Sequence, residues 1–425
     1  MLDSIMDRRN IEKALLQVER NKGVGGVDGM QTDALRDYLN TDYQQLRMEV
    51  ITGTYRPGPV KKVEIPKPHG GVRMLGIPTV KDRLLQQAIS IWLNQFYEPV
   101  FSGFSYGFRP NRNAHQAVLQ AQTFLNEGKT YVVELDLEKF FDKVNHDKLM
   151  GLLMRKVTDK ATLGLIRQYL RSGIMENGVV SPRLEGTPQG SPLSPLLSNI
   201  ILDELDRELG RRGLSFVRYA DDCSIYVKSE KSAQRVLASI TRYIEKDLKL
   251  KVNREKSKVS RPTESTLLGF SFYNNRGKWE IRIAKKSIDR IKEKSKAITK
   301  RNNGSNTRQK ILKMQPLIQG WVTYFSIAKA KSAMLELDRC VRLRLRMGLW
   351  KEWKTCRTRV SNLLKLKAGK QKSYEWGNSS RGYCRVAYSP ILCTTLNNAY
   401  FSKQGYIGFY NTYSRLTSET QPSLF

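Results

Sequence analysis

The chain has 425 residues, and 40% of them are hydrophobic, which is enough for several cores in a globular protein. It carries 73 Lys and Arg against 40 Asp and Glu, a formal net charge of +33 that predicts a polyanionic partner such as a nucleic acid. The sequence has no run of about 18 apolar residues, no signal-like amino terminus and no Cys or His pattern typical of zinc. We therefore expect a cytoplasmic protein with no membrane partner.

Residues 1–130 are predicted to mix helices with a strand hairpin. Residues 1–50 favour helices around a glycine-containing loop at 23–29, and one helical face carries four apolar residues, Ile11, Ala14, Leu15 and Val18. Val60–Ile65 has the pattern of a strand, and prolines bracket it. Gly70-Gly71 is typical of a hairpin turn after that strand.

Acidic residues follow two apolar stretches in the middle of the chain. The strand-like run from Tyr131 ends near Asp136, and a helical pattern starts from Val144. The sequence Tyr219-Ala220-Asp221-Asp222 lies between the apolar runs 214–217 and 223–227, which is typical of a β-hairpin with the acids at or beside its tip. Both acidic features also have a simpler interpretation. Asp136 could be a helix N-cap, and the pair Asp221-Asp222 could lie in a solvated turn.

Taken together, the three acids predict a metal site. Adjacent carboxylates repel one another, and burying them costs free energy unless a positive charge compensates. Carboxylate oxygens are ligands that suit Mg²⁺. Asp136 with Asp221 and Asp222 would form the cluster that holds two metal ions about 3.5–4 Å apart for in-line phosphoryl transfer.

The remainder of the chain is predicted to be helical and strongly basic. Ile281–Lys351 has the pattern of three amphipathic helices. Between Ile281 and Lys370 the sequence has 25 Lys and Arg against five acidic residues. After Lys354, aromatic residues alternate with basic ones, a pattern that suits either a hydrophobic core or stacking on bases.

Eight short motifs follow one another along the chain, at residues 21–29, 65–73, 105–110, 136–142, 186–195, 219–222, 253–258 and 268–270. In their order and spacing these motifs resemble group II intron reverse transcriptases, also called maturases. The resemblance covers nearly the whole chain. Many members of that family end in a His- and Cys-rich DNA endonuclease, and we expect a form without that domain.

The resemblance implies an α+β fold with right-hand polymerase architecture. Fingers and a palm with an antiparallel sheet would occupy residues 1–280, of which 1–50 form an N-terminal extension. A helical thumb, or maturase domain, would follow over residues 281–350. A small C-terminal DNA-binding domain would occupy residues 351–425.

The resemblance also implies roles in binding the metal ions and the incoming deoxynucleoside triphosphate. Asp136 and Asp221 would bridge two Mg²⁺ ions, the carbonyl of Leu137 would complete a shell, and Asp222 would lie close by. Lys67 and Arg73 would bind the triphosphate, because Arg pairs with phosphate bidentately and Lys acts as a point charge. A solvated basic hairpin is the alternative for this last pair.

Three further residues are expected at the nucleotide. Phe141 would exclude a ribose 2′-hydroxyl, whereas the adjacent Phe140 is predicted to be a core residue. Gln189 would pack against the nucleotide, and Gly190 would allow a close approach of the backbone. Lys256 is a candidate to protonate pyrophosphate, with Lys258 as the competing candidate.

Nucleic-acid contacts complete the expectation. Arg109, Arg112 and the 21–29 loop would contact template phosphates, and Arg342 and Arg346 would contribute to nucleic-acid binding by the third thumb helix. The implied partners are an intron RNA template, a DNA primer or target, and deoxynucleoside triphosphates. The expected function is RNA-directed DNA synthesis together with binding of the intron RNA to assist splicing. Two alternatives are an intron-free reverse transcriptase in DNA repair or phage defence, and an RNA-binding splicing cofactor with a vestigial polymerase site.

Overall fold

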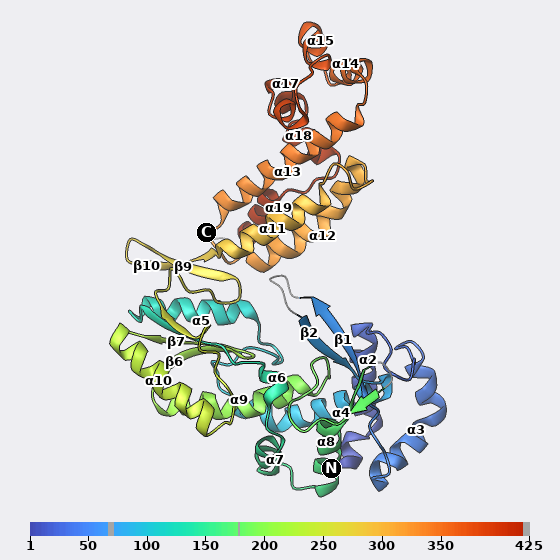
Figure 1. The fold of residues 1–425 in the computed structure, drawn as a ribbon, viewed down its shortest axis with the longest axis vertical. Helices are drawn as coiled ribbons and strands as arrows, with labels where there is room; N and C mark the ends of the chain where they lie inside the picture. The colour runs from blue at the N-terminus through green and yellow to red at the C-terminus, as the bar shows by residue number, and fades with distance from the viewer. Residues whose placement is uncertain (67–71, 177–178, 420–425) are drawn as a thin grey trace. The chain divides into compact units, whose positions relative to one another are not determined.

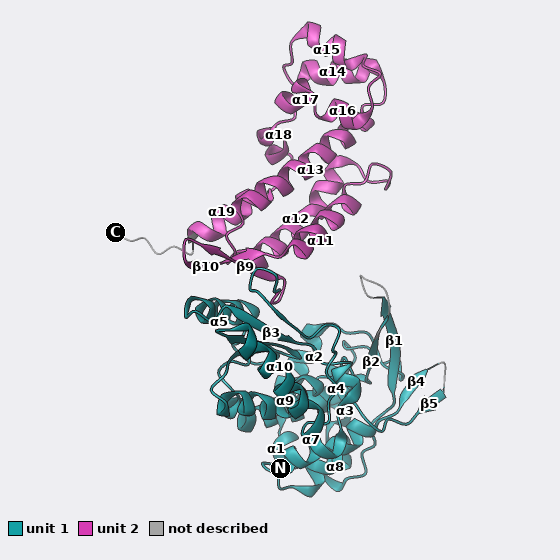
Figure 2. Cartoon of the chain, turned by 60° about the vertical axis from the view of Figure 1, so that its left-hand side comes forward, with its two compact units in different colours: residues 1–265 teal, residues 266–425 magenta. Residues whose placement is uncertain are grey.

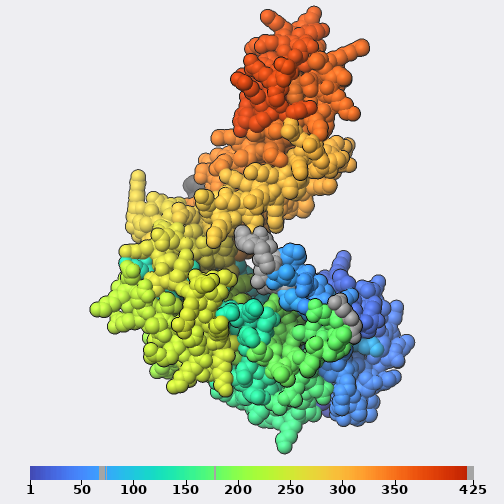
Figure 3. Space-filling view, in the orientation of Figure 1, coloured from blue at the N-terminus to red at the C-terminus, as the bar shows by residue number. Residues whose placement is uncertain are grey.

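The computed structural model describes residues 1–66, 72–176 and 179–419. The chain divides into two compact units, residues 1–265 and 266–425 (Figure 2). In unit 1, one cluster of buried apolar side chains extends from Leu2 to Val252. The space-filling view shows the blue N-terminal residues adjoining the green middle of the chain on one surface (Figure 3). The N-terminal helices therefore share their core with the rest of unit 1.

Helices are the commonest elements of unit 1, and polar caps define where many of them begin. Thr79, Asn145 and Ser229 each accept a backbone N–H at the start of a helix. The predicted apolar face of the second helix is buried. The helices are α1 (Leu2–Ile5), α2 (Arg8–Asn21), α3 (Leu35–Thr52), α4 (Val80–Tyr97), the 3₁₀ turn η1 (Glu98–Val100), α5 (Ala114–Asn126), α6 (Phe140–Lys143), α7 (His146–Met154), α8 (Lys160–Arg171), α9 (Ser194–Arg211) and α10 (Glu230–Lys246).

A four-stranded sheet, the central sheet, positions the acids (Figure 1). Its order is β6-β7-β3-β8, formed by β6 (Ser215–Tyr219), β7 (Asp222–Val227), β3 (Tyr131–Leu135) and β8 (Lys258–Ser260). Every pairing in it is antiparallel. Helices α5 and α10 pack against its strands. The predicted α+β class with an antiparallel central sheet is confirmed.

A second sheet of unit 1, the outer sheet, has the order β2-β1-β4-β5. It consists of β1 (Val60–Pro66), β2 (Val72–Ile77), β4 (Ile174–Glu176) and β5 (Val179–Ser181). Strands β1 and β2 pair antiparallel, which confirms the predicted strand and hairpin. The Gly70-Gly71 turn between them lies outside the described residues.

Unit 2 begins with a strand hairpin and continues with helices. Its elements are β9 (Phe270–Asn275), β10 (Lys278–Ile283), α11 (Lys285–Ile298), α12 (Thr307–Phe325), α13 (Lys331–Glu352), α14 (Cys356–Lys365), α15 (Lys370–Gly377), α16 (Tyr383–Ala387), α17 (Pro390–Thr395), α18 (Asn398–Lys403) and α19 (Phe409–Glu419). Hydrogen bonds join this hairpin to the helices. Ser287 Oγ donates to the carbonyl of Gly269, and the backbone amide of Lys329 donates to the carbonyl of Ile281. These contacts explain why β9 and β10 group with unit 2, whereas the predicted boundary at residues 280/281 falls within β10.

The last helix, α19, packs against α12 and α13. Asp338 of α13 accepts hydrogen bonds from the Tyr406 hydroxyl at 2.7 Å and from the backbone amides of Phe409 and Tyr410 at 2.8 and 2.9 Å. Phe409 is buried against Trp321. Several aromatic residues near the C-terminus are therefore core residues, whereas Tyr374 and Tyr388 are exposed. Among the described residues, no helix has the length and hydrophobicity that crossing a membrane requires.

Candidate active site

The turn between β6 and β7, residues 219–222, presents two acids; we call it the acid turn. Tyr219 and Asp222 are paired across the end of the hairpin, which confirms the predicted hairpin with the acids at its tip. Ala220 adopts a left-handed conformation with φ +57° and is buried. This conformation disfavours a residue with a Cβ atom and needs support from the surroundings. The tight reversal leaves Asp221 in the turn and Asp222 at the first position of β7.

Asp136 comes to the same place from the neighbouring strand. Leu135, the last paired residue of β3, lies opposite Cys223 of β7. Continuing this antiparallel register by one residue places Asp136 opposite Asp222. The helix α6 starts only at Phe140, with Lys139 at its N-cap position. Asp136 is therefore not a helix cap, and the structure brings all three predicted acids together as an acid cluster.

The segment 252–257 bonds to the backbone of Asp136, a structural role that the sequence analysis did not predict for it. The amide of Asp136 donates to Ser257 Oγ at 3.0 Å, and the carbonyl of Asp136 accepts from the amide of Asn253 at 2.8 Å. An antiparallel bridge joins Leu137 to Val252 and uses the carbonyl of Asp136 rather than that of Leu137. The Leu137 carbonyl is thus left out of this bridge. Ser257 lies in a motif that carried the resemblance, but only the structure shows its contact.

The electrostatics of the acid cluster follow from its crowding. Removal of water by the surrounding protein raises the pKa of Asp222 to about 6, and the charges of Asp221 and then Asp136 add to the shift. Asp222 still exposes much of its side chain. The repulsion between the acids is therefore the better-supported cause. Lys256 Nζ lies 3.7 Å from Asp136 Oδ2, but Lys256 is exposed and this ion pair is weak.

The acid cluster fits divalent cations by its chemistry. The charges of Asp221 and Asp136 disfavour the ionisation of Asp222, and a cation beside these acids would offset that repulsion. Carboxylate oxygens are the ligands that Mg²⁺ prefers. No three His, Cys, Asp or Glu side chains in the described part of the chain enclose a metal position on their own. An incomplete protein shell suits Mg²⁺, which usually keeps water and substrate phosphate among its ligands. Asp136, Asp221, Asp222 and the carbonyl of Leu137 are the groups available for this role.

A cavity of about 570 Å³ contains several of the predicted nucleotide-binding residues. Phe141 lines it and is half-buried, with its ring 6.4 Å from that of Phe108. Phe140 is only 3% exposed, which confirms it as the core residue of the pair. Gln189 and Gly190 line the same cavity. The structure therefore brings Phe141 and Gln189 to one hollow.

Gly190 illustrates why a glycine is needed at this wall of the cavity. Its φ is +109°, and a Cβ atom there would come within 2.9 Å of the carbonyl oxygen of Gly76. The amide of Gly76 donates to the carbonyl of Gln189 at 2.7 Å, so the turn is bonded to β2. The backbones of Gly190 and Gly76 thus approach closely, and the expected approach of Gly190 to a nucleotide stays a prediction. Lys67 lies outside the described residues, and the backbone of Arg73 pairs with Ile65 in the β1–β2 hairpin.

The prediction for Arg109 is not supported by its surroundings. Its guanidinium is buried and pairs with Glu98 at 2.8 Å. The same group donates to the carbonyls of Ser102 and Ser105. All these partners are within the protein, so Arg109 braces the segment 98–109 and does not present its charge to a template. A sequence cannot distinguish this role from phosphate binding, because both use the same side chain.

The other predicted arginines differ in their exposure. Arg112 is exposed and lies over the ring of Tyr106 at 5.6 Å, so it remains a candidate for phosphate contact. Arg342 is half-buried. Arg346 is also half-buried and donates to the carbonyl of Leu396 at 3.0 Å. Arg346 therefore joins α13 to the segment before α18, and its predicted role in nucleic-acid binding is not supported.

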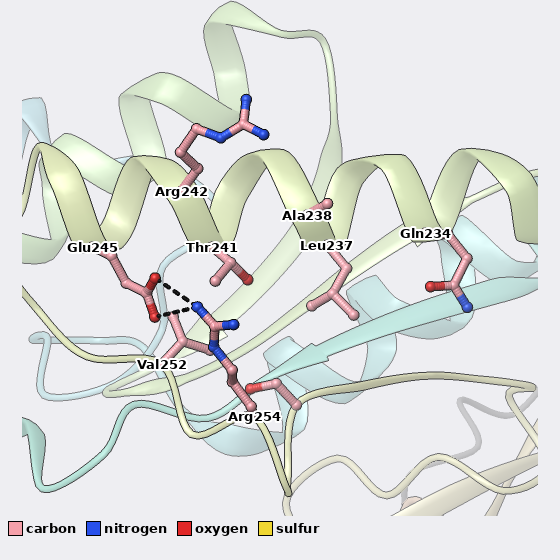
Figure 4. Close-up of a pocket in the computed structure, with 9 residues that line it drawn as sticks. Gln234, Leu237, Ala238, Thr241, Arg242, Glu245, Val252 and Arg254 are labelled. Atoms are coloured by element: carbon pink, nitrogen blue, oxygen red, sulfur yellow. Dashed lines mark hydrogen bonds and ion pairs between the residues drawn. The ribbon is translucent and has the colours of Figure 1, made fainter.

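A separate cavity of about 490 Å³ lies between α10 and the 252–257 segment (Figure 4). Arg254 and Glu245 form an ion pair of 3.0 Å there. Val252 and Ser257, which also line the cavity, belong to the segment that holds Asp136. This cavity contains none of the predicted site residues.

Comparison with known protein families places these features in a class. Residues 65–272 match the family described as "Reverse transcriptase (RNA-dependent DNA polymerase)". Residues 288–366 match "Group II intron, maturase-specific domain". The first match contains the whole acid cluster, and the second lies within unit 2. The chain belongs to the reverse transcriptases, the RNA-directed DNA polymerases, and within them to the group II intron type that carries a maturase domain.

Two individual relatives and one solved structure are similar to parts of this chain. Protein YkfC of Escherichia coli K12 is 33% identical over 59% of this chain and 75% of its own length. The group II intron-encoded protein LtrA of Lactococcus lactis is 38% identical over 47% of this chain, but this match spans only 33% of LtrA. A solved chain titled "Partial Cas6-RT-Cas1--Cas2 complex" is 26% identical over 58% of this chain and 42% of its own, with a TM-score of 0.34.

Proposed function

We propose that this chain synthesises DNA on an RNA template by nucleotidyl transfer at the acid cluster, and that it binds an intron RNA to assist splicing. The observation that carries the first part is the meeting of Asp136 with Asp221 and Asp222 at the end of the central sheet. The family match supports both parts. The expected cofactor is a pair of Mg²⁺ ions held by these acids and the carbonyl of Leu137.

The division of labour in the reaction follows from the positions of the side chains. Bound divalent ions would lower the pKa of the primer 3′-hydroxyl and stabilise the negative charge of the departing pyrophosphate. Asp136, Asp221 and Asp222 would fix the place where the reacting groups meet. Phe141 would lie against the sugar of the incoming nucleotide and exclude a 2′-hydroxyl. Gln189 would pack against the base pair in the same cavity.

Positive charge is also needed at the triphosphate. We assign Lys67 and Arg73, which flank the turn of the β1–β2 hairpin, to its phosphates. Lys256, beside Asp136, is our candidate for protonating pyrophosphate. The partners on this proposal are an RNA template, a DNA primer or target, and deoxynucleoside triphosphates. Unit 2 would provide the thumb and DNA-binding parts, with α11 to α13 as the thumb.

The test is primer extension on an RNA template with the purified chain. Asp221→Ala removes a proposed metal ligand, and we expect it to abolish extension with Mg²⁺. Asp289→Ala, a matched change at an exposed acid of α11, should leave extension unchanged. Substantial synthesis by Asp221→Ala would contradict the assignment of the acid cluster as the site of nucleotidyl transfer.

A further inference from the structure

A buried ion pair lies directly beneath the acid turn. Arg218, in β6, is two residues before Ala220, and Asp206 is in α9. The guanidinium donates to both carboxylate oxygens of Asp206, at 2.7 and 2.6 Å. The side chains are 1% and 0% exposed, so water reaches neither of them. An arginine between Val217 and Tyr219 in an otherwise apolar strand was visible in the sequence, but its partner was not.

The same guanidinium also holds the turn. Arg218 Nη1 donates to the carbonyl of Ala220 at 2.9 Å and to Oδ1 of Asn199 at 3.0 Å. Ala220 is the residue in the left-handed conformation, which an alanine rarely adopts without support. The hydrogen bond to its carbonyl fixes the orientation of the peptide that joins Ala220 to Asp221.

A second contact holds the turn from the side of residues 104–107. Asn199 Nδ2 donates to the carbonyl of Gly107 at 2.9 Å. A Cβ atom at Gly107 would lie 2.1 Å from the amide nitrogen of Ala220, so the two backbones touch. Tyr106 and Arg218 are also joined, because the Tyr106 amide donates to the Arg218 carbonyl at 2.9 Å. The acid turn is thus held from two sides by one connected network.

We propose that Arg218, with Asp206 and Asn199, is a positioning unit for the acids that bind the metal ions. Arg218 touches neither substrate nor metal and acts through the peptide after Ala220. This inference rests on the proposed function, since it assigns the network a role in holding Asp221 and Asp222 at the distance from Asp136 that two cations require.

An arginine suits this role for a geometric reason. Its planar fork pairs with Asp206 through Nε and Nη2 and still has Nη1 for the Ala220 carbonyl, whereas a lysine offers only a point charge on a flexible stem. A buried ion pair is weak evidence for a role in stability, because apolar residues of similar volume often replace it without loss. A specific geometric role explains better why charged groups are buried here.

The experiment removes both charges together. Arg218→Met with Asp206→Leu leaves no unpaired buried charge, so we expect a folded protein with a melting temperature near that of the parent. We expect its kcat for primer extension to fall by about 10- to 100-fold, since a displacement of about 1 Å at a reacting centre can cost about 100-fold. The Mg²⁺ concentration for half-maximal activity should rise several-fold, with KM for the nucleotide nearly unchanged.

A readout without catalysis accompanies the kinetics. Mn²⁺ binding to the protein alone, followed by electron paramagnetic resonance, should weaken several-fold in the double variant. The matched control is Glu204→Gln with Arg155→Gln, which removes the 2.7 Å ion pair between Glu204 of α9 and Arg155 and leaves the contacts of Arg218, Asp206 and Asn199 in place. That control should retain the parent's kcat, Mg²⁺ dependence and Mn²⁺ affinity.

The outcomes separate this inference from the proposed function. A parent protein that neither extends primers nor binds Mn²⁺ overturns the proposed function itself. An active parent and a folded double variant with the same kcat, Mg²⁺ dependence and Mn²⁺ affinity overturn the positioning role. If the double variant does not fold, Asn199→Leu decides, because it removes the contacts to Arg218 and Gly107 without removing a charge. Parent-like kinetics and Mn²⁺ binding in that folded variant would equally overturn the proposal.

Discussion

At the scale of single residues, the crowding of acids that suits the acid cluster to bind cations also lowers the stability of the metal-free protein. The pKa of Asp222 is raised from the ordinary 3.8 to about 6, so between these values the folded state holds a proton that the unfolded state has lost. The folded state is therefore favoured below this window, and the metal-free protein loses stability as the pH rises through it. A bound divalent cation would compensate the charge that Asp222 acquires as the pH rises through this window.

This gives a prediction for Asp222→Asn, which cannot ionise. In a chelator and at about pH 7.5, the variant should melt at a higher temperature than the parent, and the difference should shrink at about pH 4, where the parent carboxyl is protonated in the folded state. Added Mg²⁺ should raise the melting temperature of the parent more than that of the variant. Differential scanning calorimetry at both pH values checks this, and a difference independent of pH would contradict the electrostatic explanation.

The adjacent phenylalanines should have separable effects. Phe141→Ala opens the cavity wall and should raise incorporation of ribonucleotides relative to deoxynucleotides, with little loss of stability because the ring is half-buried. Phe140→Ala empties a core site and should cost about 3–5 kcal/mol of unfolding free energy. Competitive nucleotide incorporation and urea unfolding measure the two effects. An exchange of these phenotypes would show that Phe140, not Phe141, is the residue that faces the sugar.

The residues that could be predicted well from the sequence are those whose position in the fold is indicated by their immediate neighbours in the chain. Asp136, Asp221 and Asp222 each follow or interrupt an apolar run, so their place at strand ends could be recognised. Arg109 and Arg346 could not be assigned correctly, because whether an arginine meets a phosphate or a protein carbonyl depends on tertiary neighbours. Arg218 was overlooked for the same reason, since its partner Asp206 lies on a different element.

At the scale of elements, the attachment of α19 to α13 depends on one carboxylate. Asp338 receives the first two amides of α19, where the positive end of the helix dipole favours a negative charge. It also receives the hydroxyl of Tyr406. A side chain from one helix thus caps another that follows about 70 residues later in the chain.

Removing this cap should loosen the end of unit 2. Asp338→Ala should destabilise unit 2 by at least about 2 kcal/mol, because each hydrogen bond to a charged group contributes about 1.5–3 kcal/mol. Amide hydrogen exchange over residues 409–419 should accelerate more than exchange in α11. Asp289→Ala, at an exposed acid of α11, is the control and should change neither. Unchanged protection of α19 in Asp338→Ala would show that its apolar contacts suffice.

Elements with a strong local signal were predicted well, including the β1–β2 hairpin, the β6–β7 hairpin and the three helices from α11 to α13. The grouping of the β9–β10 hairpin with those helices was not, because it depends on hydrogen bonds to Gly269 and Lys329 that no local pattern shows. The packing of α19 on α12 and α13 was missed for a similar reason. A division into thumb and DNA-binding parts at residue 350 stays a prediction.

At the scale of the whole molecule, charge is the dominant property, with +33 in total. Not every basic residue is available to a nucleic acid, since Arg109, Arg218 and Arg346 serve the protein interior. On α11, Lys286, Arg290 and Lys294 are exposed and recur every four residues, so they share one face. That face is a better candidate for phosphate contact than the arginines of α13, two of which are bonded to protein carbonyls.

The two proposed functions should separate by variant. Asp221→Ala with Asp222→Ala should abolish DNA synthesis and leave RNA binding and assisted splicing nearly intact, because RNA binding needs a basic surface rather than metal ions. Changing Lys286, Arg290 and Lys294 to Gln should weaken RNA binding and reduce both activities. The slope of log affinity against log salt concentration should become less steep by about 0.7–0.9 for each phosphate contact that is lost. Lys231, Arg235 and Arg242, exposed on α10, form a charge-matched control that should have a smaller effect.

The measurements are primer extension, filter binding over a range of salt, and, where an intron flanks the gene, splicing of that intron at low Mg²⁺. An unchanged salt slope in the α11 variant would show that this face does not meet phosphate. Loss of splicing in a folded double Asp variant would show that the two functions share the acid cluster. A parent that synthesises DNA but assists no flanking intron would favour the intron-free polymerase, because the basic surface would then serve only template and primer. A parent that assists splicing without synthesis would favour the splicing cofactor, with the acid cluster a remnant of an ancestral polymerase.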